Sequence, residues 1–161
     1  MTITLDAIDH KILTLLQQDG SLSIADVADQ LGMSVPPCWR RIKRLKNLGV
    51  LQRQIWIADP IALGLGTTIF ATVKLATHDV AATSAFRKEV GALAEVMECH
   101  ILLGTIDALL KIVVPDIKYY ESLFYDRLCQ LPGVREINSS VSMSEVKKSY
   151  SLPSIRPPPA R

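Results

Sequence analysis

The sequence has no long uninterrupted hydrophobic run, although hydrophobic residues make up 48% of its 161 residues. A membrane-spanning helix needs about 20 consecutive apolar residues, so we expect no contact with a membrane. The N-terminus also lacks the basic flank and apolar stretch of an export signal. Cysteine is scarce, with three residues spaced widely at Cys38, Cys99 and Cys129. This spacing predicts neither a disulfide framework nor a metal site and favours a cytoplasmic protein.

Acidic residues are absent between Asp29 and Asp59, and this absence is the most informative one. The net charge is only +2, and the first 29 residues carry five aspartates and one lysine. The acid-free window instead contains Arg40, Arg41, Lys43, Arg44, Lys46 and Arg53. A solvated helix face is the alternative explanation, but surface helices usually alternate the two signs of charge. The concentrated basic segment therefore predicts an anionic partner.

Three helices are predicted before residue 50. Asp6 can cap a first helix, which has apolar residues at helical spacing and stops at Gly20. A second, shorter helix follows Ser23 and ends at Gly32, and a third extends from Ser34 to about residue 48. Two short helices separated by a tight turn at a glycine are typical of a helix-turn-helix.

The third helix combines an apolar stripe with a basic remainder. At about 100° per residue, its buried stripe is Cys38, Ile42, Leu45 and Leu48. Long cationic side chains outside the stripe can attract phosphates and form bidentate hydrogen bonds with guanine. We therefore predict double-stranded DNA as the partner. Contacts with bases or nearby phosphates are expected from Arg40 and Arg44, and contacts with the DNA backbone from Arg41 and Lys43.

Two further DNA contacts are predicted at the ends of this helix. Pro36 and Pro37 remove the amides that a capping Ser34 would bind. Either the Ser34 hydroxyl is left to bind a phosphate, or the helix begins a residue or two later. Residues 50–57 predict a short strand or hairpin, and a β-wing there would place Arg53 on a flanking phosphate. Residues 1–62 are thus expected to form a winged helix-turn-helix domain.

Residues 63–150 are expected to form a second domain, a ferredoxin-like βαββαβ sandwich. Strict alternation between Thr67 and Ala76 predicts the first strand. A helix at about 80–90, strands at about 96–103 and 108–114, a helix capped by Asp116 and a strand at about 135–146 complete the order. Two helices then cover one face of an antiparallel sheet, which makes the fold class α+β.

The other face of the predicted sheet and the end of the chain carry separate expectations. That face mixes polar residues with Phe70, Leu109 and Val113, which favours cover by a second sheet in a homodimer over exposure to solvent. A dimer also suits palindromic DNA half-sites. Residues 151–161 are rich in proline and are expected to form a flexible tail.

Several short motifs follow one another along residues 4–150. They are Leu5-Asp6-x-x-Asp9, the block from Ser34 to Leu45, Glu98-Cys99-His100, Gly104-x-x-Asp107, Leu131-Pro132-Gly133-Val134 and Met143-x-Glu145-Val146-Lys147. Together they resemble the Lrp/AsnC family of transcriptional regulators. The resemblance implies a winged helix-turn-helix, a sensing domain that pairs through its sheet, and dimers that assemble into tetramers or octamers. It also implies a small effector, typically an amino acid, bound between dimers.

The resemblance places the effector site at the turn Gly104, Thr105 and Asp107, with Ser139 or Ser140 nearby. An acidic side chain can hold an α-ammonium group, and glycine allows close backbone approach to a carboxylate. The usual family turn is Gly-Asp-aromatic-Asp, whereas this chain has Thr105 and Ile106 at the two middle positions. Either the ligand differs or binding is weak, and a plain turn role for Asp107 is the alternative.

Two other functions are compatible with the same architecture. An enzyme similar to the sirohaem decarboxylases would use histidines of the sensing domain, but no nucleophile–base spacing or glycine-rich phosphate loop is evident. An amino-acid-binding module without DNA binding would have no use for the basic third helix. We therefore expect a sequence-specific regulator that is not an enzyme, needs no cofactor and responds to an amino-acid-like effector.

Overall fold

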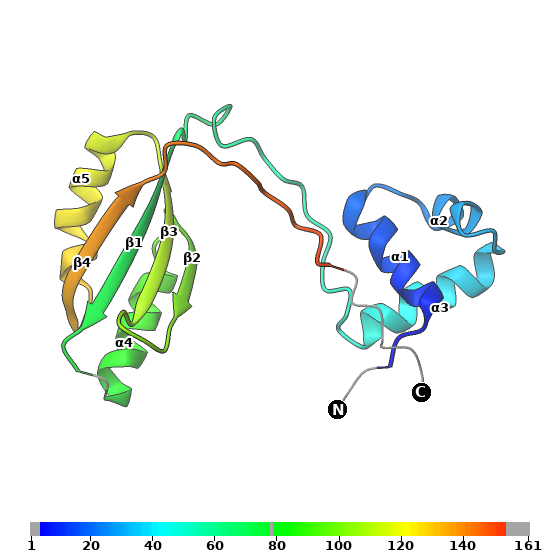
Figure 1. Cartoon of the computed structure of the whole chain (residues 1–161), viewed down its shortest axis with the longest axis horizontal. Coiled ribbons are helices and arrows are strands. Elements are labelled where there is room, and N and C mark those ends of the chain that lie inside the picture. Colours follow the sequence, from blue (N-terminus) through cyan, green and yellow to red (C-terminus); the bar gives the residue numbers. More distant parts are fainter. Residues whose placement is uncertain (1–3, 78, 154–161) are drawn as a thin grey trace. The chain divides into compact units, whose positions relative to one another are not determined.

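The computed structural model describes residues 4–77 and 79–153, and these form two compact units (Figure 1). The helical unit contains the described residues up to Ile57 together with residues 147–153. The sheet unit contains the described residues from 58 to 146. Within the described residues, no helix is both long and apolar enough to span a bilayer.

The helical unit is a helix-turn-helix, as predicted. Its helices are α1 (Ala7–Gln18), α2 (Ile24–Gln30) and α3 (Val35–Asn47). The Asp6 carboxylate caps α1 by accepting hydrogen bonds from the amides of Ile8 and Asp9, and Ser23 caps α2. Gly32 has a φ of 62° in the turn between α2 and α3, a conformation that glycine adopts without strain.

A single apolar core holds the three helices together. It consists of Ile12, Val27, Ala28, Cys38, Ile42 and Leu45. The predicted stripe of α3 is therefore confirmed at Cys38, Ile42 and Leu45. Leu48, which was expected to join the stripe, follows the end of the helix and is exposed.

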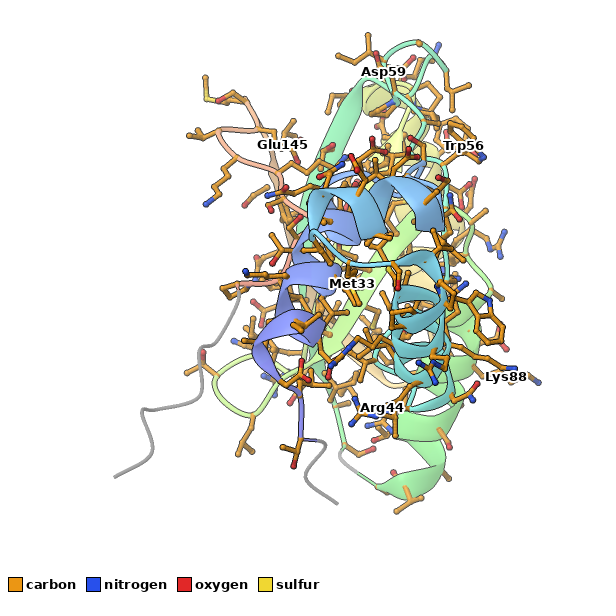
Figure 2. All side chains as sticks on the ribbon, turned by 90° about the vertical axis from the view of Figure 1, so that its right-hand side faces the viewer. Met33, Arg44, Trp56, Asp59, Lys88 and Glu145 are labelled. Atoms are coloured by element: carbon orange, nitrogen blue, oxygen red, sulfur yellow. The ribbon has the colours of Figure 1, made fainter. Side chains whose placement is uncertain are left out.

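The strand or hairpin expected over residues 50–57 is not formed. Residues 52–59 belong to no helix or strand. Trp56, labelled in Figure 2, is 95% exposed, and Ile55 and Ile57 are exposed beside it. A strand needs a hydrogen-bonding neighbour, and no strand of the described chain pairs with this segment. The segment therefore has the composition of a strand but no partner, and the described residues form no β-wing.

The sheet unit has the predicted βαββαβ order. Its elements are β1 (Thr67–Leu75), α4 (Val80–Gly91), β2 (Val96–Ile101), β3 (Ala108–Val114), α5 (Ile117–Asp126), a 3₁₀ turn at Leu128–Gln130, and β4 (Val134–Val141). The strands pair antiparallel in the order β2-β3-β1-β4. β2 ends two residues earlier than predicted, and β4 ends at Val141 rather than 146.

The two faces of the sheet differ as predicted. Ile69, Ala71 and Val73 of β1 are buried in a core with Phe86 of α4 and Leu123 of α5. Within the described sheet unit, the opposite face carries no helix (Figure 1) and presents the alternate residues. It includes Phe70, Thr72, Lys74, Glu98, His100, Leu109, Lys111, Asn138 and Ser140.

The chain returns to α1 after the sheet unit. The Ser151 hydroxyl donates a hydrogen bond to the backbone oxygen of Gln17 at 3.0 Å, and the Leu152 amide donates to Gln17 Oε1 at 2.8 Å. We call residues 147–153 the C-terminal strap. The described part of the predicted flexible tail, residues 151–153, is thus attached to α1, and the rest of that prediction lies outside the described residues.

Candidate DNA interface and effector region

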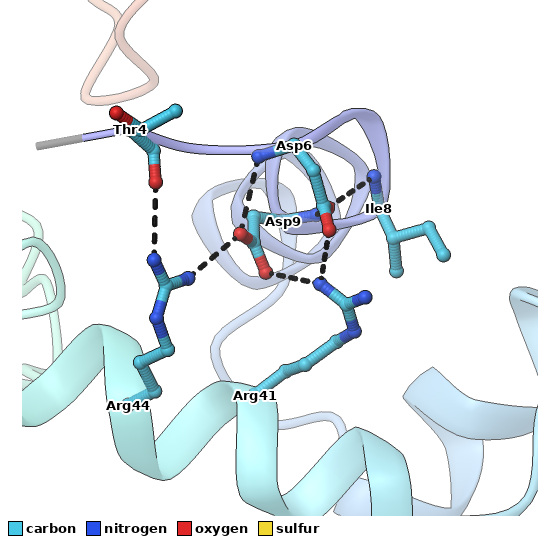
Figure 3. Close-up of polar contacts among 6 residues, drawn as sticks. All are labelled: Thr4, Asp6, Ile8, Asp9, Arg41 and Arg44. Carbon is cyan, nitrogen blue, oxygen red and sulfur yellow. Dashed lines mark hydrogen bonds and ion pairs between the residues drawn. The ribbon is translucent and has the colours of Figure 1, made fainter.

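A buried carboxylate organises the surface between α1 and α3 (Figure 3). Asp9 is 1% exposed and accepts hydrogen bonds from Arg41 Nη1 at 2.8 Å and Arg44 Nη1 at 2.9 Å. Arg41 Nη1 also contacts Asp6 Oδ2 at 2.6 Å. We call Asp6, Asp9, Arg41 and Arg44 the aspartate–arginine cluster. It joins the start of α1 to the second half of α3.

Hydrogen bonds within the cluster favour the charged forms of Asp6 and Arg41. The pKa of Asp6 lies below its ordinary value, first because the Asp9 amide donates a hydrogen bond to the carboxylate and second because Arg41 does so. The pKa of Arg41 is raised by the Asp6 carboxylate and then by Asp9. Because a buried carboxylate is costly without partners, these contacts hold Asp9 in place.

Two of the predicted DNA contacts are therefore also bound within the chain. Arg44 donates from Nη2 to the Thr4 backbone oxygen at 3.0 Å in addition to its contact with Asp9. The side chains of Arg41 and Arg44 are 30% and 48% exposed. Sequence reasoning missed this pairing, although the Leu5-Asp6-x-x-Asp9 motif was the available signal.

Arg40 lies beside the aspartate–arginine cluster but is not bonded to it. Within the described residues it makes no hydrogen bond or ion pair, and it lines an open hollow with Thr4, Pro37 and the cluster. Figure 2 labels Met33, just before α3, and Arg44 in its last turn, which together mark the length of the helix. Arg40 lies about halfway along it, opposite the buried stripe.

Lys43 is the second basic residue on the outward side of α3, and Trp39 lies beside it. The Lys43 ammonium lies 4.8 Å from the centroid of the Trp39 ring, and Trp39 is 46% exposed. The four-residue spacing of this pair places both side chains on one side of the helix. Trp39 was not among the predicted contacts, and that spacing was the signal for it.

The remaining predicted DNA contacts lie at the two ends of α3. Ser34 is the N-cap, and the helix begins at the next residue rather than later. The Ser34 hydroxyl makes no capping hydrogen bond, as expected when prolines occupy the next positions. Arg53 lies in the unpaired segment after α3 and is exposed.

In the sheet unit, Asp107 ties the turn between β2 and β3 to β1. Its carboxylate accepts a hydrogen bond from the Leu75 amide at 2.8 Å, and its own amide donates to the Val73 oxygen at 2.9 Å. Gly104 and Thr105 are exposed in this turn. A Cβ added at Gly104 would meet nothing within 4 Å. The space beside Gly104 is therefore open.

The two predicted serines lie across β1 from this turn. Ser139 pairs with Ala71, and its hydroxyl is 2.6 Å from the Tyr120 hydroxyl on the face that the helices cover. Ser140 pairs with Phe70 and faces the opposite side of the sheet. Since β1 separates β4 from β3, one chain does not bring these serines together with Gly104 and Asp107.

The fold and the basic helix define a helix-turn-helix DNA-binding protein with a second, ferredoxin-like domain. Residues 5–52 match the family model for winged helix-turn-helix DNA-binding domains. Residues 68–152 match the Lrp/AsnC ligand binding domain. The chain belongs to the Lrp/AsnC family and is a DNA-binding transcriptional regulator.

Individual relatives agree with this assignment over nearly the whole chain. The DNA-binding transcriptional activator DecR of Escherichia coli is 37% identical over 92% of this chain and 98% of its own length. The leucine-responsive regulatory protein of Klebsiella pneumoniae is 36% identical over 92% of this chain and 90% of its own. A transcriptional regulator of Neisseria meningitidis solved with L-Met has a TM-score of 0.89 and 31% identity, over 93% and 97% of the two chains.

Proposed function

We propose that the protein acts in the cytoplasm as a sequence-specific regulator that binds operator DNA through α3 and responds to an amino-acid-like effector. The observation that carries the DNA assignment is that only some of the basic residues of α3 have acidic partners. Arg40 and Lys43 have no acidic partner among the described residues, and no acidic residue occurs between Asp29 and Asp59. Their charge is therefore available to phosphates and guanine edges.

The cluster arginines have a second role in this proposal. Arg41 and Arg44 position α3 against α1, and a guanidinium has five N–H donors. Each arginine therefore keeps donors for a DNA phosphate after bonding with Asp6, Asp9 or Thr4. Ser34 and Arg53 supply further backbone contacts at the two ends of α3.

The effector proposal rests on the turn of the sheet unit. A carboxylate accepts several hydrogen bonds, so Asp107 can hold an α-ammonium group while bonded to Leu75. Gly104 leaves room for the ligand carboxylate, and Thr105 offers a hydroxyl. The names of two relatives support an amino acid, since one is leucine-responsive and another was solved with L-Met.

Assembly would complete the effector site. We propose a homodimer that covers the helix-free face of the sheet, with dimers joined into a tetramer or octamer. Phe70 is exposed on that face, and burying such apolar area favours association. A neighbouring copy would then bring Ser139 or Ser140 to the turn of the first chain.

DNA binding is tested by comparing arginine variants on a duplex from the region upstream of the protein's own gene. Arg40→Ala should lower the affinity for DNA about tenfold at low salt. The plot of log affinity against log salt concentration should also become less steep by about 1, the amount expected for one lost phosphate contact. Arg87→Ala, which removes an exposed arginine of α4 in the sheet unit, is the matched control. Equal affinity of Arg40→Ala and wild type would contradict the proposed interface.

Effector binding is tested by a thermal-shift screen of the amino acids. A ligand of the sheet unit should raise the unfolding temperature of the wild type, because it binds only the folded state. The shift should be lost in Asp107→Ala and kept in Asp59→Ala, which changes an aspartate far from the turn in the sequence. A shift of equal size in Asp107→Ala would place the effector elsewhere.

Catalysis has no place in the proposal. A function similar to the sirohaem decarboxylases would instead be supported by turnover of a tetrapyrrole. An amino-acid-binding module without DNA binding would show the thermal shift but no salt-dependent retention of the upstream duplex.

A further inference from the structure

The two flanks of α3 are built differently. One flank carries Arg41 and Arg44, which are bonded to the aspartates of α1. The other flank carries Trp39 and Lys43, which contact each other. At about 100° per residue, Arg40 lies between the two flanks. The second flank has no role in the aspartate–arginine cluster.

Trp39 is an unusual residue to leave on this flank. Nearly half of its surface is exposed, at 46%, and no hydrogen bond of its indole N–H is found within the described residues. A large aromatic side chain with a polar edge contributes most to binding when an apolar surface covers its ring and an acceptor bonds to its N–H. The charge of the residues around Trp39 indicates which class of partner provides that surface. With no acid between Asp29 and Asp59, a polyanion fits.

The position of Trp39 also points to bases rather than to the DNA backbone. It occupies the first half of α3, which begins at Val35. In helix-turn-helix proteins the N-terminal residues of the recognition helix contact base edges in the major groove. The apolar group that bases display there is the C5-methyl of thymine, which apolar side chains contact.

We propose that Trp39 is a specificity-determining residue that contacts the methyl group of a thymine in the operator. This proposal rests on the proposed binding of DNA by α3. Lys43 orients the indole by placing its ammonium over one ring face and attracts a neighbouring phosphate at the same time. The exposed part of the indole is then available to the thymine.

Replacing single thymines with deoxyuridine tests the contact, because the change removes only the methyl group. The duplex is the upstream segment that the wild-type protein protects in a footprint. At one position the replacement should weaken binding by the wild type about fivefold. The same replacement should have no effect on Trp39→Ala, because the contact is already missing. Equal losses for both proteins, or no loss at any position for the wild type, would overturn the proposal.

Fluorescence gives a second, independent measurement. The chain has two tryptophans, so Trp56→Phe leaves Trp39 as the only one. Its emission should change when the duplex is added and should change less with the deoxyuridine duplex. Constant emission on binding would overturn the proposal even if affinity is normal. If the wild type fails to bind the upstream region at all, the proposed function fails instead, which separates the two results.

Discussion

The helical unit and the sheet unit each contain an aspartate that fixes local structure near a proposed binding surface, but their partners differ. Asp9 accepts from two arginine side chains, whereas Asp107 accepts from the backbone amide of Leu75. No backbone hydrogen bond joins α1 to α3 in the described chain, so these side-chain contacts and the apolar core hold the two helices together. The strands are already paired, and one carboxylate is enough to hold a turn. Both aspartates thus have partners inside the chain before any ligand arrives.

The largest effect is expected from Asp9→Ala. The change removes the buried acceptor of Arg41 and Arg44 and should lower the free energy of unfolding of the helical unit by about 2–3 kcal/mol, because hydrogen bonds to a charged group are lost. Urea unfolding followed by tryptophan fluorescence measures this unit alone, because Trp39 and Trp56 both belong to it. Asp29→Ala, at an exposed position of α2, should change little. Similar losses in both variants would mean that the cluster does not hold α1 to α3.

A smaller effect is expected in the sheet unit from Asp107→Ala. The Leu75 amide loses its acceptor, which should lower the free energy of unfolding by about 1–2 kcal/mol. Hydrogen exchange at the Leu75 amide measures the change directly. Asp107→Asn keeps an acceptor oxygen and should retain most of the protection. If Asn exchanges as fast as Ala, charge rather than the hydrogen bond holds the turn.

The two units should also differ in their response to acid. The Asp6 pKa is depressed in the folded helical unit, chiefly by the hydrogen bond from the Asp9 amide and next by Arg41. The stability it supplies is therefore complete above the ordinary value of 3.8 and is lost as pH falls through the lower folded value. Asp6→Asn should flatten the acid side of the tryptophan-detected stability curve.

Glu98 is the counterpart in the sheet unit. Hydrogen bonds from His100 and then Lys111 lower its pKa from 4.5. The stability that Glu98 contributes is lost as pH falls below that ordinary value. Glu98→Gln should therefore flatten the acid side of the stability curve of the sheet unit and leave the curve of the helical unit unchanged. A change in both curves with either variant would show that the units do not unfold separately.

The smallest effect is expected at the C-terminal strap. Ser151→Ala removes one exposed hydrogen bond to Gln17 and should cost about 0.5 kcal/mol. Exchange of the Leu152 amide should nevertheless become faster, because the neighbouring attachment is weakened. Ser144→Ala, outside the strap, is the control. Unchanged exchange in Ser151→Ala would show that the hydroxyl does not fasten the strap.

Local signals predicted most of the elements. The capping residues Asp6, Ser23 and Asp116 mark helix starts that the structure confirms. Alternation from Thr67 to Leu75 correctly predicted which face of β1 is buried. These features depend on residues within one or two turns of the chain, so a single sequence contains them.

Contacts between distant segments were not predictable in the same way. Periodicity places Arg41 and Arg44 outside the α3 stripe, but their partner Asp9 lies 32 and 35 residues away on another helix. The pairing between Ser151 and Gln17 spans 134 residues. The strand expected over residues 50–57 was wrong because a strand also needs a hydrogen-bonding neighbour. The composition of a segment does not supply that neighbour.

The C-terminal strap makes the helical unit discontinuous along the chain, and this affects the order in which the protein is completed during synthesis. The helical core uses only residues from Leu5 to Leu51, so it can close while later residues are still being added. The whole sheet unit, residues 58–146, follows before the strap is made. Among the described residues, the hydrogen bonds at Gln17 are then the last contacts of the helical unit to form. The helical unit, whose core is made before the sheet unit, is therefore completed after it.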